Sequence, residues 1–239
     1  MSALIDFHSH ILPGVDDGSA SLDETISLLR LEAEQGVTHV VATPHFYPQY
    51  DSPERFLERR ERAEKKLREA LKEHPELPGV SMGAEVYYYH GISNSDVISE
   101  LTIEGKRCIL IEMPGAPWTD AMFRELEALY ERRGIVPIVA HLDRYIGRFH
   151  TFGIPQRLER MPVMVQANAE FFQQRSTTAM ALRMLKRGQI HLLGSDCHNL
   201  TSRKPNLGGA AALIRKRLGE DVLDRIASCA QDVLNGRTF

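Results

Sequence analysis

Short runs of apolar residues alternate with longer amphipathic stretches along the chain. The runs are rich in β-branched residues, and most are too short for helices, so each predicts a buried strand of a mostly parallel sheet. Seven such strands are expected, at residues 3–7, 39–43, 80–84, 108–112, 135–140, 163–167 and 191–194. Strands separated by helical segments predict an α/β domain, either a barrel or a doubly wound sheet.

The stretches between the runs carry the start and stop signals of helices. The first helix begins at Ser21, with Glu24 three residues later as in a capping box, and ends at Gly36. In the second helix Ser52 is the expected N-cap and Pro53 the first helical residue, and its mixed charges predict a solvated face. The second helix should end near residue 73, and further helices are expected at residues 120–133, 177–186, 210–218 and 221–231.

Length and composition limit the class of protein. With 239 residues, 43% hydrophobic and 26% charged, the chain fits a single globular domain that spans residues 1–239. The 29 Lys and Arg residues against 32 Asp and Glu residues give a formal net charge of −3, so no basic excess indicates a nucleic-acid surface. No apolar run is as long as a membrane span, and no signal peptide is evident. We therefore expect a cytoplasmic protein without membrane insertion, and the oligomeric state stays open.

Three scattered cysteines, at positions 108, 197 and 229, predict a reducing compartment without disulfides. Cys197 and Arg203 fit the C-x5-R spacing of cysteine-based phosphatases. The phosphate loops of those enzymes usually contain glycine and lead into a helix, whereas "HNLTS" has no glycine and Pro205 follows closely. Cys197 also lies between Asp196 and His198, so alternation directs its side chain away from theirs. We therefore favour a metal site, with Cys197 outside the reaction.

Histidines and carboxylates recur just beyond six of the predicted strands. In chain order they are His8, His10, His45, Glu85, Glu112, His141, Asp196 and His198. Because all strands of a parallel barrel end on one face, these residues can converge on one pocket. Taken singly, a histidine at a strand end is usually a satisfied polar residue, and Glu112 could form an ion pair. The same placement of histidines and carboxylates after six strands favours a shared metal site. Bound cations would offset the carboxylate charges, which are costly when they are buried and unpaired at strand ends.

The local spacing supports shared ligation. His8 and His10 are two residues apart, so on extended backbone their side chains face the same way. Asp196 and His198, after the last predicted strand, have the same spacing. Asp16 and Asp17 precede Gly18 in "GVDDG", a turn where a carboxylate can reach inward and the glycine would relieve the backbone. The remaining histidines, at positions 39, 74, 90, 150 and 191, are assigned surface or structural roles.

Taken in order, the motifs DFHSH, GVDDG, TPH, GAEVYY, LIEM, AHLDRY and SDCHN resemble those of the polymerase and histidinol phosphatase (PHP) superfamily. Within it, the chain is similar to the bacterial manganese-dependent protein-tyrosine phosphatases encoded with capsule and exopolysaccharide genes. The H-x-H motif alone marks many metallohydrolases, and the ordered combination over nearly the whole chain carries the resemblance. It implies an α/β fold of the distorted (β/α)7 PHP-type barrel, in agreement with the seven strands expected from the pattern.

The resemblance also implies three divalent metal ions, with Mn²⁺ preferred and Fe²⁺ or Zn²⁺ compatible with nitrogen and oxygen ligands. The first ion would take His8, His10, Glu85 and Asp196; the second Glu85, Glu112 and His141; the third Asp17, His45 and His198. Asp17 is chosen over Asp16 because the family ligand immediately precedes the glycine. Arg144 and Arg203 match the family's phosphate-contacting pair, and either metal-bound water or His45 would protonate the leaving group.

The implied activity is hydrolysis of phosphotyrosine through a metal-activated hydroxide. The implied partner is a phosphotyrosine protein, a bacterial tyrosine autokinase of polysaccharide assembly. The alternative is a phosphatase for histidinol phosphate or another small phosphomonoester, against which the "VDDG" and "HLDRY" motifs weigh. A phosphodiesterase or 3′-exonuclease is disfavoured because the chain lacks a basic stripe. A regulatory module with an inactive metal site is disfavoured by the complete set of nine ligands. Aromatic residues at positions 46, 47, 87, 88 and 118 could line a tyrosyl pocket or simply pack.

Overall fold

Parallel strands form the centre of the computed structural model, which describes residues 3–146 and 153–237. The described strands are β1 (Leu4–Ser9), β2 (Val37–Ala42), β3 (His45–Phe46), β4 (Gly79–Met82), β5 (Glu85–Tyr87), β6 (Cys108–Glu112), β7 (Val136–Val139), β8 (Met164–Asn168) and β9 (Leu192–Gly194). They form two ladders, in the orders β1-β2-β4 and β3-β5-β6-β7-β8-β9, and every described pair is parallel.

The two strands beyond the seven predicted ones are continuations of their neighbours. β3 follows β2 after Thr43 and Pro44, and β5 follows β4 after Gly83 and Ala84. The backbone pairing persists across both breaks, because Gly83 N donates to Ala42 O at 2.8 Å and Glu85 N to Pro44 O at 3.0 Å. β2 and β3 therefore occupy one strand position, and β4 and β5 occupy another, so the curled parallel sheet keeps the seven predicted strand positions. The predicted distorted α/β barrel is confirmed. That residues 1–239 form one domain stays a prediction.

The barrel closes where the end of β9 meets β1. The contact is an isolated parallel bridge between Ser9 and Cys197. On either side of this bridge, Asp196 N donates to His8 O at 2.8 Å and His10 N to Cys197 O at 2.9 Å. The register of β1 against β2 also shifts between Asp6 and Ser9. The seam thus joins the two segments that carry the H-x-H and D-x-H spacings.

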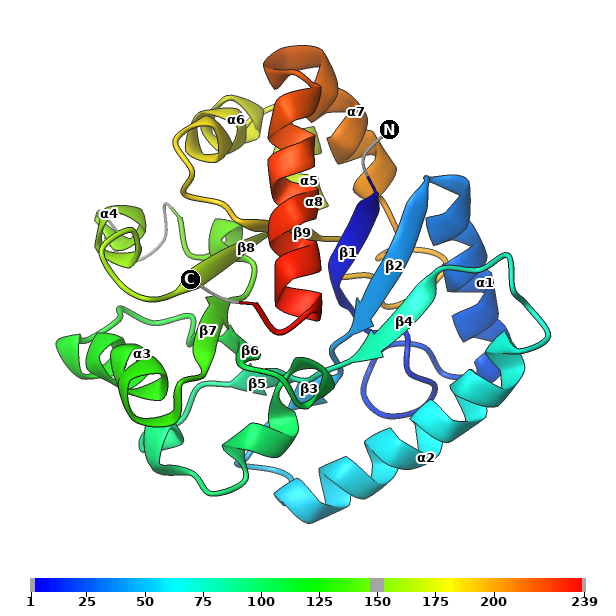
Figure 1. Ribbon diagram of the computed structural model, residues 1–239, viewed down its shortest axis with the longest axis horizontal. Coiled ribbons are helices and arrows are strands. Elements are labelled where there is room, and N and C mark those ends of the chain that lie inside the picture. Colours follow the sequence, from blue (N-terminus) through cyan, green and yellow to red (C-terminus); the bar gives the residue numbers. More distant parts are fainter. Residues whose placement is uncertain (1–2, 147–152, 238–239) are drawn as a thin grey trace.

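Helices surround the sheet (Figure 1). The six predicted helices are confirmed as α1 (Leu22–Glu34), α2 (Pro53–Leu71), α3 (Asp120–Arg133), α6 (Thr178–Lys186), α7 (Leu207–Leu218) and α8 (Glu220–Leu234). Their starts follow the expected chemistry, since Ser21 Oγ accepts from Glu24 N at 3.2 Å and Ser52 Oγ from Arg55 N at 3.3 Å. The pattern did not predict the short α4 (Ile154–Leu158) and α5 (Ala169–Gln173), nor the 3₁₀ turns η1 (Ile92–Asn94), η2 (Ile98–Leu101), η3 (Ile103–Gly105) and η4 (Leu142–Arg144).

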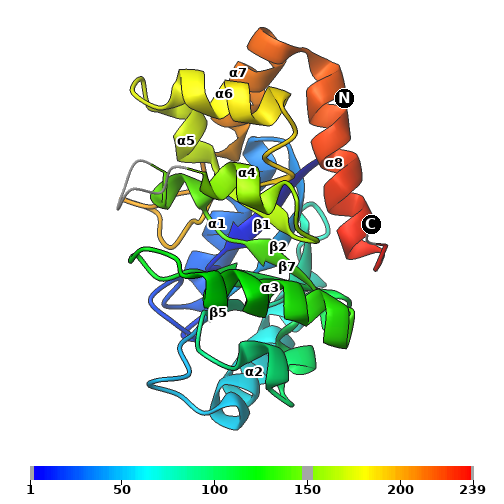
Figure 2. The same ribbon diagram turned by 90° about the vertical axis from the view of Figure 1, so that its left-hand side faces the viewer.

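The barrel interior is apolar at the end opposite the site. Ile5 and Phe7 of β1 pack there with side chains of β6 to β9 and with Ala230, Val233 and Leu234 of α8. Two views at right angles place α8 along one side of the molecule, over the starts of the strands (Figure 1, Figure 2). Because α8 covers the amino ends of the strands, the carboxyl ends remain for polar chemistry.

A glycine fixes the close approach of β9 to β1. A Cβ at Gly194 would lie 2.5 Å from His8 Cβ and 3.0 Å from His8 N. We therefore expect Gly194→Ala to lower the free energy of unfolding by about 1–3 kcal/mol, which is about 2–4 °C in Tm per kcal/mol for a chain of this size. Gly115→Ala is the matched control, because a methyl group there meets nothing within 4 Å. Thermal denaturation tests this, and equal Tm values for the two variants would contradict it.

Candidate metal centre

The nine predicted ligands all lie at the carboxyl end of the barrel. They come from β1 and the turn after it (His8, His10, Asp17), β3 (His45), β5 (Glu85), β6 (Glu112), the turn after β7 (His141) and the segment after β9 (Asp196, His198). Residues almost 190 positions apart are thereby brought into contact. That they hold metal ions stays a prediction at this point.

Glu85 lies at the middle of the group and is fully buried. Its Oε2 is 2.9 Å from His45 Nδ1, 3.2 Å from His8 Nε2 and 3.3 Å from His10 Nε2. Its other oxygen, Oε1, is 2.7 Å from His141 Nε2. One carboxylate therefore contacts four imidazoles from three segments of the chain, which is the position of a ligand shared between ions.

Three further carboxylates extend the group. Asp196 Oδ1 lies 3.6 Å from His8 Nε2 and 3.4 Å from His10 Nε2. Asp17 is largely exposed, and its Oδ1 lies 3.6 Å from His198 Nε2 and 3.7 Å from the Nε2 of His45. The third of these carboxylates is Glu112, whose Oε1 lies 3.8 Å from His141 Nε2 and whose Oε2 lies 4.0 Å from His45 Nδ1. Every predicted ligand therefore faces at least one other.

The ring nitrogens of three histidines are oriented by hydrogen bonds on their far side. Nδ1–H of His10 donates to Asp16 Oδ2 at 2.7 Å, and Nδ1–H of His198 donates to the Asp196 carbonyl at 3.0 Å. Nδ1–H of His8 faces Gln166 Oε1 at 3.3 Å. In each case Nε2 is directed at the centre, which is the usual arrangement of metal-ligating histidines.

Several buried atoms at the centre lack the partners that a metal-free site would need. His45 Nδ1, Glu85 Oε2 and His198 Nε2 are buried without a hydrogen bond, although the first two lie 2.9 Å apart. The Nε2 atoms of His8 and His10 face each other at 3.1 Å. Ligand atoms bound to one ion at about 2.1 Å are about 3 Å apart. The residues present therefore fit divalent cations.

The charges at the centre depend on one another. Burial would raise the pKa of Glu85 and of Asp196, but the neighbouring histidine charges outweigh it and hold both pKa values well below the usual range. Burial would likewise lower the pKa of His10, yet the hydrogen bonds that its ring donates to Asp16 and Asp196 raise it well above 6.5. Protons on histidine thus offset the carboxylates when no cation does, so cation binding here displaces protons.

Asp16 and Asp17 divide two roles that the sequence left adjacent. Asp16 is buried, and besides His10 it accepts from Gly18 N at 3.0 Å and from His45 N at 2.8 Å. It therefore positions two predicted ligands, while Asp17 faces the centre as predicted. We expected Gly18 to relieve a strained φ, and this prediction is wrong, because the φ of Gly18 is not in the left-handed region. Instead the chain passes so close that a Cβ at Gly18 would lie 2.1 Å from His10 O.

Sequence reasoning assigned no site residue to the strand now seen as β8, and the structure corrects this. Gln166 Oε1 accepts from His141 N at 2.6 Å in addition to facing His8. Asn168 Nδ2 donates to Asp196 Oδ2 at 3.0 Å, and Gln166 Nε2 donates to Asn168 Oδ1 at 3.0 Å. The signal was available, because Gln and Asn interrupt the otherwise apolar run "VMVQAN" with the period of inward-facing positions.

The two predicted phosphate-contacting arginines lie side by side. Arg144 Nη2 donates to Asp196 Oδ2, and Arg203 Nη2 donates to Asp196 Oδ1 at 2.7 Å. Both side chains are more than a third exposed, at 39% and 37%. His141 and Asp196, each adjacent to this pair, adopt positive φ values of 31° and 55°. Such strained backbone persists mainly at functional sites.

Comparison with known proteins agrees with this geometry. The family model for capsular polysaccharide synthesis, CpsB/CapC, matches residues 4–235. The chain belongs to the CpsB/CapC family. It is 30% identical over 239 residues to the tyrosine-protein phosphatase CpsB of Streptococcus pneumoniae, covering 90% of this chain and 91% of CpsB. It is 27% identical over 247 residues to the tyrosine-protein phosphatase YwqE of Bacillus subtilis strain 168, covering 99% and 93%.

A solved structure of this CpsB/CapC group has the same fold. It comes from work on YwqE of Bacillus subtilis and CpsB of Streptococcus pneumoniae, described as unique metal-dependent tyrosine phosphatases. The TM-score is 0.86 at 23% sequence identity, over 99% of this chain and 96% of the other. The barrel fold is thereby confirmed, and the family match confirms the resemblance to the capsule-encoded phosphatases.

Behind the centre, this CpsB/CapC member carries a buried acidic cluster that the sequence did not predict. Asp6 Oδ1 accepts from Ser195 N at 2.9 Å and from His8 N at 3.1 Å, so it ties the two sides of the barrel seam together. Glu32 of α1 lies against Asp6, and burial together with the Asp6 charge raises the pKa of Glu32 well above 4.5. Cys197 completes the cluster, with Sγ 4.0 Å from Glu32 Oε1. The thiol thus faces α1, away from the side chains of Asp196 and His198, and only this turning away was predicted from alternation.

The other described histidines have the minor roles assigned to them. His39 Nε2 lies 2.8 Å from Ser81 Oγ, and His191 Nδ1 accepts from Val165 N at 3.0 Å. His74 lies beside Glu76, and His90 is exposed. His150 lies outside the described residues.

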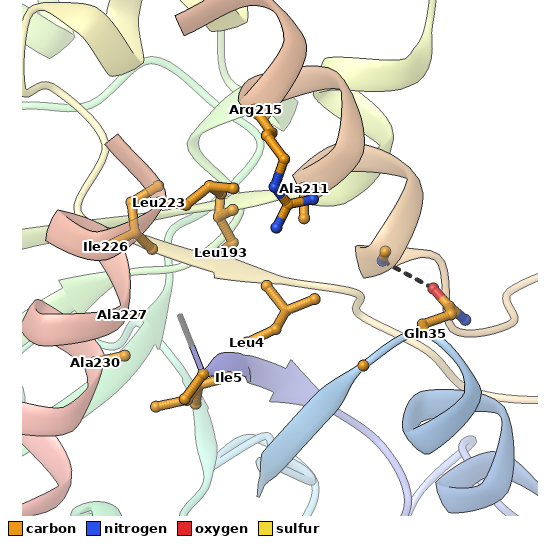
Figure 3. A pocket seen from close by; sticks show the side chains of 13 residues that line it. Leu4, Ile5, Gln35, Leu193, Ala211, Arg215, Leu223, Ile226, Ala227 and Ala230 are labelled. Carbon is orange, nitrogen blue, oxygen red and sulfur yellow. Dashed lines mark hydrogen bonds between the residues drawn. The ribbon is translucent and has the colours of Figure 1, made fainter. Parts of the chain in front are cut away.

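A separate cavity of about 160 Å³ lies between α7, α8 and β1 (Figure 3). It is lined largely by aliphatic side chains and contains none of the nine ligands.

We expect Cys197 to be the least reactive thiol of the folded protein. It is fully buried, and burial raises its pKa well above 9.0, whereas Cys229 is only partly buried, with a pKa of about 11. A thiol nucleophile needs an accessible thiolate. Alkylation with iodoacetamide followed by mass spectrometry should therefore modify Cys229 before Cys197, and guanidinium should expose both. Modification of Cys197 first would contradict this placement.

Proposed function

We propose that this protein is a metal-dependent tyrosine-protein phosphatase, a hydrolase of phosphotyrosine in proteins. The observation that carries the proposal is the convergence of four imidazoles on Glu85, with Arg144 and Arg203 beside them at Asp196. A cluster that binds several cations next to two guanidinium groups suits a dianionic phosphate ester. The names of the CpsB and YwqE relatives support the same activity.

We propose three divalent ions, held as the resemblance implies, with Mn²⁺ preferred. Three overlapping donor groups support this number: His8, His10 and Glu85; His45, Glu85 and Glu112; and His10, Asp17, His45 and His198. Nitrogen and carboxylate donors without thiolate are compatible with Mn²⁺, Fe²⁺ or Zn²⁺. When bound, such ions would activate water as the nucleophile and offset the charge of the ester.

The side chains of the chain itself provide orientation. Arg144 and Arg203 both donate to the Asp196 carboxylate, so an incoming phosphate can replace that carboxylate as their acceptor and be held by two guanidinium groups. His10 and His198 are held in place by hydrogen bonds on their Nδ1 atoms, which fixes the geometry of the centre before substrate arrives. His45 is only 10% exposed, and its Nε2 lies 3.7 Å from Asp17 Oδ1. Either a water held at the centre or His45 itself would protonate the leaving phenolate.

The aromatic residues beside the centre favour a tyrosyl ester over the alternative, histidinol phosphate or another small phosphomonoester. Tyr47 packs on His45 at 4.9 Å and on Tyr87 at 5.5 Å between ring centroids. Its hydroxyl donates to Glu112 Oε2 at 3.2 Å, so the ring is anchored beside the predicted ligands. A phenol of pKa about 10 is also an easier leaving group than an alkyl alcohol.

We propose a phosphotyrosine protein as the partner, a bacterial tyrosine kinase of capsule assembly, and a cytoplasmic location. The family's role in capsular polysaccharide synthesis supports this choice of partner. Within residues 3–146 and 153–237, none of the helices combines the length and the apolar character needed to cross a membrane.

We expect chelation to abolish activity. Treatment of the purified protein with EDTA should remove the ions and reduce phosphotyrosine peptide turnover to background, and Mn²⁺ should restore it, because the buried carboxylates of the centre need cations. Histidinol phosphate assayed in parallel should be the poorer substrate. Cys197→Ala should keep its turnover. Full activity after metal removal, combined with loss of activity in Cys197→Ala, would contradict the proposal.

We expect Arg203→Ala to weaken substrate binding without loss of metal. The variant removes a charged donor that would hold the phosphate, so KM for a phosphotyrosine peptide should rise about tenfold or more. Elemental analysis should find the same metal content as in the wild type. Arg203→Lys keeps the charge but loses the two-donor fork, so its KM should fall in between. Loss of the metals in Arg203→Ala would instead indicate a structural role.

A further inference from the structure

A second cavity opens beside the metal centre and extends beyond it. It has a volume of about 410 Å³ and shares Asp17 and His45 with the centre. Its far wall is formed by Tyr47 and Tyr50 from the loop after β3, and by Arg55 and Arg59 from the first turns of α2. Neither arginine belongs to the predicted ligand set or to the phosphate-contacting pair.

The far wall carries a net positive charge. Arg59 Nη2 lies 2.5 Å from Asp51 Oδ2, and Arg55 Nε lies 3.9 Å from Asp51 Oδ1. One carboxylate therefore faces two guanidinium groups. The Arg55 side chain is 76% exposed, so most of its donors face water and remain available. On the opposite side of the cavity, the Asp17 carboxylate is directed toward His45 and His198.

Aromatic rings connect the centre to this charge. Tyr47 lies next to His45 at 4.9 Å and next to Tyr50 at 6.5 Å between ring centroids. Tyr50 is 87% exposed, which is unusual for a side chain of its size. A peptide that enters along these rings would pass from the metal centre to the two arginines within a few residues, since extended backbone advances about 3.3 Å per residue.

We propose that this cavity binds an acidic side chain next to the phosphotyrosine of the substrate. The inference rests on the proposed function and names its substrate class. The phosphate being hydrolysed is held by Arg144 and Arg203 near β7 and β9, so the arginines of α2 are free to contact a different residue. Arg55 makes the contact, Arg59 supports it, and Asp51 competes with the substrate anion for both.

The test compares two phosphotyrosine peptides that differ only in the residues beside phosphotyrosine, glutamate in one and glutamine in the other. The readout is the ratio of their kcat/KM values, because loss of fold or of metal changes both values and leaves the ratio unchanged. The wild type should prefer the glutamate peptide about two- to fivefold, as expected for an exposed charge contact. The preference should weaken as salt is added.

Three variants separate the roles of the charges. Arg55→Ala should reduce the ratio to about one, and Asp51→Asn should raise it above the wild-type value, because the competing carboxylate is gone. Arg62→Ala is the matched control on the same helix. It is 66% exposed, pairs with Glu58 at 3.7 Å and does not line the cavity, so it should keep the wild-type ratio.

Each failure has its own meaning. A wild-type ratio of one would overturn the assignment of the cavity while leaving the phosphatase activity intact. An unchanged preference in Arg55→Ala, or a loss of preference in Arg62→Ala, would overturn it as well. Absence of turnover of both peptides and of para-nitrophenyl phosphate by the metal-loaded wild type would instead overturn the proposed function itself.

Discussion

The structure depends on one costly arrangement, a group of buried carboxylates and imidazoles that cannot satisfy one another. Glu85 contacts four histidines, yet its Oε2 and the Nδ1 of His45 have no hydrogen bond although they lie 2.9 Å apart. In a protein interior such atoms are destabilising unless cations or protons bind them. The raised pKa of His10 indicates that protons take this role when metal ions do not. Much of the surrounding architecture serves to hold this group in place.

A surrounding layer of hydrogen bonds fixes the directions of the ligands. Asp16 holds His10 and the backbone of His45, Gln166 holds His8 and His141, and Asn168 holds Asp196. Asp6 ties the backbone at His8 to that at Ser195, across the seam where the barrel closes. These contacts come from different strands, so the geometry of the centre is a property of the whole barrel. The proposed recognition of an acidic neighbour of phosphotyrosine, by contrast, would depend on the loop after β3 and on α2, which lie outside this layer.

The sequence predicted the periodic and chemical features well. Six helices and seven strand positions followed from apolar spacing and caps, and the nine ligand-type residues followed from their place after the strands together with the family motifs. The sequence could not reveal features that depend on close packing. Gly18 and Gly194 are required by approaches of another segment. Pro44 and Gly83 mark the breaks after β2 and β4, but neither residue indicates that strand pairing resumes just beyond it. The pairing of Asp6 with Glu32 links residues 26 positions apart, and no local pattern specifies it.

The most direct test of the central claim is anomalous diffraction from crystals of the protein purified with Mn²⁺ and measured near the manganese edge. The account predicts three peaks at the carboxyl end of the barrel, with Glu85 contacting two of them and His198 contacting the third. A protein that turns over phosphotyrosine with no peak beside Glu85, or with its metal bound only at the Asp6, Glu32 and Cys197 cluster, would contradict it.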